Sequence, residues 1–142
     1  MILLHAGLAS LVLLLGPIIL LGPKGADRHR RLGRVFAAAV LASNLSSFFI
    51  TELTGRPSFI HALAAINLAT LIHALWAARC RRITDHVTSM IYCYAGFVAA
   101  VLVRLDYLLP LPWPYGFAAI VAATFFATAL LLKRYGPQPN SG

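Results

Sequence analysis

The chain has very few charged residues, and acidic residues are the scarcest among them. Only 11% of its 142 residues are charged, with four Asp or Glu against twelve Lys or Arg. An ordinary soluble domain carries roughly a quarter charged residues. So small a charged share, combined with 60% hydrophobic residues, excludes a soluble globular fold.

The sequence also lacks the signatures of soluble-type catalysis. It has no Gly-rich phosphate loop, no serine nucleophile elbow and no pair of carboxylates on one face of a helix. Its two cysteines, Cys80 and Cys93, lack the spacing of a metal site, and we expect no disulfide. Hydrolase, kinase and nucleotide-binding activities are therefore not expected.

Long apolar runs occupy nearly all of the chain. There are five, at about residues 2–22, 35–54, 59–78, 87–109 and 115–132. A helix of about 20 apolar residues crosses the ~30 Å hydrocarbon core of a bilayer. The sequence therefore predicts an all-α, polytopic transmembrane bundle of five spans over residues 1–135, followed by a disordered C-terminal tail at 136–142.

Basic residues gather in loops on one side of this predicted bundle. Ten of the twelve fall there: Lys24, Arg28, Arg30, Arg31, Arg34, Arg79, Arg81, Arg82, Lys133 and Arg134. The positive-inside rule then places the N-terminus outside and the C-terminus in the cytoplasm. We expect these loops to contact anionic lipid headgroups, and we expect no nucleic-acid partner.

Two asparagines, Asn44 and Asn67, fall near the middle of their predicted spans. Leaving either amide unpaired in hydrocarbon would cost several kcal/mol. We therefore expect a mutual or shared hydrogen bond between helices, which is a structural role.

Ionisable groups at membrane depth usually mark function, and here they form two layers. The outer layer contains His5, Glu52, His61, Arg104 and Asp106, and the cytoplasmic layer contains Asp27, His29, His73, Asp85 and His86. His86 and Arg104 are five helical turns apart and share one face of their span. Met90 and Cys93 lie near that face, as packing residues or as soft ligands.

The segment from Asp27 to Arg34 is unusually rich in cations for a short turn. Its arginines and His29 could hold a phosphate or a carboxylate through bidentate contacts, or they could contact lipid headgroups.

The order of several short motifs resembles a family of bacterial membrane proteins known as domain of unknown function 2306. The motifs are His5 with Gly7 and Ala9 before Gly16-Pro17, His29-Arg30 with Gly33-Arg34, His86 with Met90, and Arg104. The resemblance implies a compact helical bundle in the bacterial inner membrane and marks His5, His29, Arg30, Arg34, His86 and Arg104 as the family-type polar positions. It implies no activity. Ser89 stands where the family usually has Trp, and His61 and His73 lie outside the motif.

One hypothesis is a redox-linked membrane protein that binds haem b or a transition metal. Its predicted cofactor-binding residues are His5, His29, Arg30, Arg34, His86, Met90 and Arg104. A metal would take His29, His73 and His86, or alternatively His5 and His61 at an outer site. His61 and His73 are twelve residues apart and point about 120° away from each other, so they cannot share one axis.

Two other classes remain open. The chain could be a non-catalytic accessory subunit or assembly factor of a larger respiratory or photosynthetic membrane complex, or a homo-oligomer, because its loops are short. It could also be a small transporter, although the apolar gap between the histidine layers offers no continuous titratable path.

Overall fold

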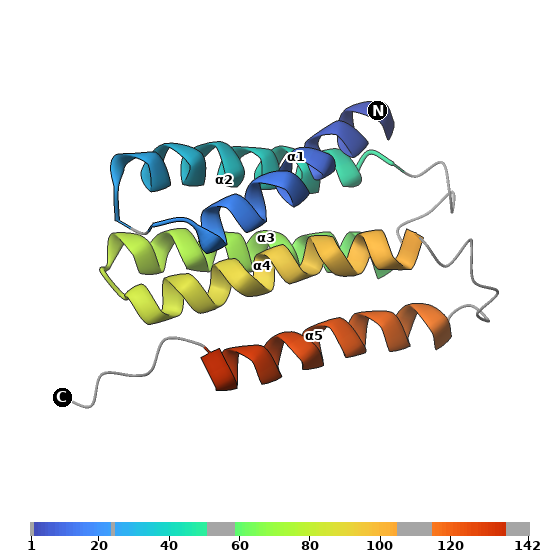
Figure 1. Ribbon diagram of the computed structural model, residues 1–142. Helices are drawn as coiled ribbons and strands as arrows, with labels where there is room; N and C mark the ends of the chain where they lie inside the picture. Colours follow the sequence, from blue (N-terminus) through green and yellow to red (C-terminus); the bar gives the residue numbers. More distant parts are fainter. Residues whose placement is uncertain (1, 24, 51–58, 105–114, 136–142) are drawn as a thin grey trace. The chain divides into compact units, whose positions relative to one another are not determined.

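The computed structural model describes residues 2–23, 25–50, 59–104 and 115–135, and its regular structure there is all helical (Figure 1). The helices are α1 (Ile2–Leu21), α2 (Asp27–Ser47), α3 (Phe59–Arg79), α4 (Ile83–Arg104) and α5 (Tyr115–Tyr135). Both the all-α class and the number of long helices are therefore confirmed. The tail predicted at 136–142 lies outside the described residues.

Within the described part of the chain, three helical segments are long and apolar enough to cross a membrane: Ile2–Leu21, His61–Arg79 and Ile83–Val103. α5 contains a shorter apolar stretch, Ala118–Lys133. α2 has four arginines within its first eight residues, which makes it more polar than the others. Crossing by α2 and α5 stays a prediction.

Contacts within the chain define two compact units, residues 1–71 and 72–142, with the division inside α3. In the first unit α1 packs against α2, and in the second α4 packs against α5. The single bundle expected over residues 1–135 stays a prediction.

Small and polar side chains fill the interior of the first unit. Val12, Val40 and Ser43 are completely buried, and short side chains such as these let helix backbones approach closely in lipid. Asn44 and Asn67 are also buried, and the Nδ2 group of Asn44 donates to Oδ1 of Asn67 at 3.0 Å. The hydrogen bond expected between the two amides is therefore confirmed, and it joins α2 to the first half of α3.

The second unit uses the same kind of packing. Ala74, Ala77, Cys93 and Ala99 are completely buried. The rings of Tyr92 on α4 and Phe125 on α5 stack with their centroids 6.0 Å apart. Alanines on α3 and α4 thus leave room for close backbone packing, while aromatic rings cover the contact with α5.

α3 ends in a Schellman motif, which joins it to α4 through a very short turn. The N–H of Arg82 donates to the carbonyl of Ala77, and the N–H of Arg81 donates to that of Ala78. Arg81 occupies the left-handed position of the motif with φ of 58°, where glycine is the usual residue. The turn therefore has a positively charged residue in the left-handed conformation, which costs an L-residue about 1 kcal/mol of conformational free energy.

The amide pair can be tested with a double-mutant cycle on Asn44→Leu and Asn67→Leu. Each single change leaves the other amide buried without its partner, whereas the double change removes both polar groups. We expect a coupling of about 0.6–1.7 kcal/mol in the free energy of unfolding, the range for hydrogen bonds between membrane helices. Strictly additive effects, measured by unfolding in detergent micelles, would contradict this pairing.

The predicted orientation can be tested at Cys80, which is exposed in the α3–α4 turn, while Cys93 is buried. We expect a membrane-impermeant maleimide to label Cys80 in inverted membrane vesicles and to leave it unlabelled in intact spheroplasts. The Cys93→Ser variant isolates the Cys80 signal, and Cys80→Ser provides the background. Labelling from the outside of spheroplasts would reverse the orientation.

Candidate functional site

His5, near the start of α1, binds α2 through one ring nitrogen. Its Nδ1 lies 3.1 Å from the carbonyl oxygen of Ser43 and 3.0 Å from Oγ of Ser46. The Ser46 hydroxyl already donates to the Ser43 carbonyl at 2.8 Å, so Oγ accepts from the ring. Since the carbonyl can only accept, Nδ1 carries a proton, and in the neutral ring Nε2 is the nitrogen with the lone pair.

His86, in the first turn of α4, has the same arrangement with a backbone partner on α3. Its Nδ1 lies 2.9 Å from the carbonyl oxygen of the buried Ala74. Nδ1 is therefore the donor, and in the neutral ring Nε2 is available as an acceptor or a ligand atom. Histidines that bind metals commonly donate their other ring N–H to a carbonyl in this way, which fixes the tautomer and the ring orientation.

His73 on α3 is held differently. Its Nδ1 lies 2.9 Å from Oγ of Ser89 on α4, and its ring packs against that of Trp76 with centroids 5.7 Å apart. Because His73 belongs to α3 and the buried Ser89 belongs to α4, this contact joins the two helices. The arrangement indicates a helix-packing role for His73.

The α3–α4 turn adds a charged and aromatic contact beside these histidines. The guanidinium of Arg82 lies over the Trp76 ring, 5.3 Å from its centroid, and its Nε is 3.7 Å from a carboxylate oxygen of Asp85. Sequence reasoning placed Asp85 in the histidine layer and did not identify Trp76. An aromatic residue at the end of a span gives a weak sequence signal, because Trp commonly anchors helices at the interface.

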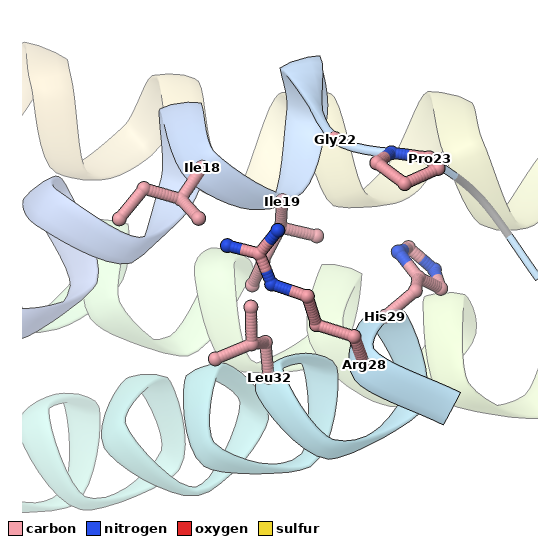
Figure 2. A pocket seen from close by; sticks show the side chains of 7 residues that line it. All are labelled: Ile18, Ile19, Gly22, Pro23, Arg28, His29 and Leu32. Atoms are coloured by element: carbon pink, nitrogen blue, oxygen red, sulfur yellow. The ribbon is translucent and has the colours of Figure 1, made fainter. Parts of the chain in front are cut away.

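The remaining predicted site residues lie at the start of α2 and along α4. His29 lines a small pocket formed by the end of α1 and the start of α2 (Figure 2). Arg30 lies 3.8 Å from Asp27 and bonds the carbonyl of Gly25, and Arg34 is exposed. Met90 is half-buried on α4, and Arg104 is the last residue of that helix.

The predicted metal sites gain no support from these positions. His29 belongs to the first unit, whereas His73 and His86 belong to the second. In the first unit, His61 packs its ring against Phe48, while His5 is bonded to Ser43 and Ser46. Among the described residues, no three His, Cys, Asp or Glu side chains gather in a way that could hold a metal ion. The metal site predicted at His29, His73 and His86 therefore stays a prediction.

Comparison with known families supports the resemblance seen in the motifs. A family model described as Predicted membrane protein (DUF2306) matches residues 2–133, a range that contains every histidine and Arg104. No curated protein and no solved structure matches the chain.

The packing role of His73 can be tested with Ser89→Ala. This change removes the hydrogen bond between α3 and α4, and we expect it to lower the free energy of unfolding by about 1 kcal/mol. Ser47→Ala is a matched control, because Ser47 is also buried and, among the described residues, its hydroxyl bonds the Asn44 carbonyl of its own helix. Equal losses in the two variants, or an undiminished effect of Ser89→Ala in a His73→Leu background, would contradict the role.

Proposed function

The chain belongs to the DUF2306 family of predicted membrane proteins, and we propose that it binds haem or a transition metal in a redox-linked role. In this proposal it is a multi-pass protein of the bacterial inner membrane, with its N-terminus outside and its C-terminus in the cytoplasm. The ligand atom is Nε2 of His86 at the cytoplasmic end of α4.

The observation that supports this proposal is the bond from His86 Nδ1 to the Ala74 carbonyl, 2.9 Å long. In the neutral ring, this bond places the proton on Nδ1 and leaves the lone pair on Nε2. A half-buried imidazole held in this form needs no reorganisation to bind a metal. The tautomer of His73 is not determined in this way, because the partner of its Nδ1 is a hydroxyl that can either donate or accept.

Met90 gives the proposed site a second, softer ligand. It lies four residues after His86 on α4, so both side chains arise from the same face of the helix. Imidazole with thioether sulfur favours copper, and above all Cu(I). For haem, Nε2 of His86 would be the proximal ligand, since a single imidazole is sufficient for that role.

A second candidate is the non-catalytic accessory subunit. The observation that favours it is the large apolar area on α5, where Tyr115, Phe126, Leu130 and Leu131 are 76%, 67%, 52% and 59% exposed. Helices of a partner protein could cover these side chains in place of lipid. In this case His5, His73 and His86 act through the helix-to-helix hydrogen bonds described above.

The decisive experiment purifies the protein in mild detergent from cells supplied with copper and a haem precursor. Bound metal is measured by mass spectrometry, and the visible spectrum is recorded before and after dithionite. We expect stoichiometric metal, with a Soret band that shifts on reduction if the group is haem. His86→Asn keeps an amide N–H for the Ala74 carbonyl but removes Nε2, so it should lose metal by tenfold or more with little change in stability.

Two further variants separate ligation from packing. His86→Leu removes both the ligand atom and the interhelical hydrogen bond, so it should lower stability by about 1 kcal/mol in addition. Ser89→Ala lies on the same helix and should retain the metal. A colourless, metal-free wild-type protein from supplemented cells would reject the proposal, and co-purification with a larger complex at fixed stoichiometry would favour the accessory subunit.

A further inference from the structure

We propose that the pocket between the end of α1 and the start of α2 binds the phosphate of an anionic phospholipid. Figure 2 shows its lining, which consists of Ile18, Ile19, Gly22, Pro23, Arg28, His29 and Leu32. The pocket has an apolar side made by isoleucine and leucine side chains and a polar side made by Arg28 and His29. This lining fits a ligand that is apolar at one end and anionic at the other.

Arg28 is the residue on which the proposal rests. Its side chain makes no hydrogen bond or ion pair with another described residue, whereas the side chain of the nearby Arg30 contacts both Asp27 and the Gly25 carbonyl. Figure 2 shows the Arg28 side chain reaching toward Ile18 and Ile19, with its guanidinium beside apolar side chains. The Arg28 side chain is nevertheless exposed, so an anion can reach the guanidinium and bind it through charge-assisted hydrogen bonds.

The depth of the pocket favours a lipid headgroup. α1 is one of the helices that can cross a membrane, and it ends at Leu21, directly before Gly22 and Pro23 of the pocket. Ile18 and Leu21 are 47% and 87% exposed, so acyl chains can reach the apolar side of the pocket. The polar side then lies where the helix leaves the hydrocarbon, which is the level of lipid phosphates.

Charge complementarity favours an anionic lipid over a neutral one. Residues 27–34 contain four arginines and one aspartate. The first turn of α2 has no side-chain cap, because Ala26 occupies the N-cap position, and the helix dipole adds positive potential at this end of α2. A guanidinium binds a phosphate with two parallel hydrogen bonds, which an ammonium cannot reproduce.

The test uses full-length protein that has been delipidated in a neutral detergent. Phosphatidylglycerol, phosphatidylcholine or inorganic phosphate is added, and bound lipid is counted by native mass spectrometry. We expect phosphatidylglycerol to bind at least tenfold more tightly than phosphatidylcholine. Arg28→Gln should lower phosphatidylglycerol affinity about tenfold, with partial rescue by Arg28→Lys.

Arg31→Gln is the matched control, because it removes the same charge from an exposed position of α2 outside the pocket. We expect it to change affinity by no more than about twofold. A second variant, Ile18→Trp, keeps every charge but fills the apolar side, and it should also weaken phosphatidylglycerol binding. Circular dichroism checks that each variant is folded.

Three outcomes would overturn the proposal. Equal losses in Arg28→Gln and Arg31→Gln would indicate diffuse attraction to the basic segment. Equal binding of phosphatidylcholine would show that the headgroup charge is not recognised. Displacement of the lipid by millimolar inorganic phosphate would indicate a soluble phosphate ligand. Because the readout is bound lipid, the result is independent of any metal at His86.

Discussion

A polar group inside hydrocarbon has to find its partner within the protein, and this requirement shapes both units of the chain. Asn44 pairs with Asn67, His5 with Ser43 and Ser46, His73 with Ser89, and His86 with the Ala74 carbonyl. Each of these bonds joins two helices. Since lipid supplies no hydrophobic force between helices, such bonds and the close packing of alanine and serine determine which helix faces pack together.

The same bonds determine the chemistry that is available. A carbonyl acceptor holds a proton on Nδ1 of His5 and His86, so in the neutral ring the contact that stabilises the helix pair also determines which nitrogen keeps its lone pair. If His86 binds a metal as proposed, stability and ligation are coupled at that residue. Substitutions that keep an N–H donor at position 86 separate the two effects, because the helix pair can then persist without the imidazole Nε2.

Much of the fold follows from the sequence, because length and hydropathy alone predict helices that cross a bilayer. The Asn44–Asn67 bond was also predictable, since two amides at similar depth have few other partners. The hydrogen-bond partners of the histidines could not be predicted from the sequence. A backbone carbonyl such as that of Ala74 has no sequence signature, and the contact of Ser89 with His73 depends on how α4 packs against α3. The pocket at Gly22 and Pro23 likewise depends on where two helix ends meet.

The left-handed conformation of Arg81 has a consequence for how the protein is made. Glycine would occupy that position of the turn without strain, so the chain carries a persistent energetic penalty for a cationic side chain. In the predicted orientation, which places this turn in the cytoplasm, the charge acts during insertion, because basic loops are retained on the cytoplasmic side. The folded protein would then keep, at one strained residue, a charge that acted only while the chain was being inserted.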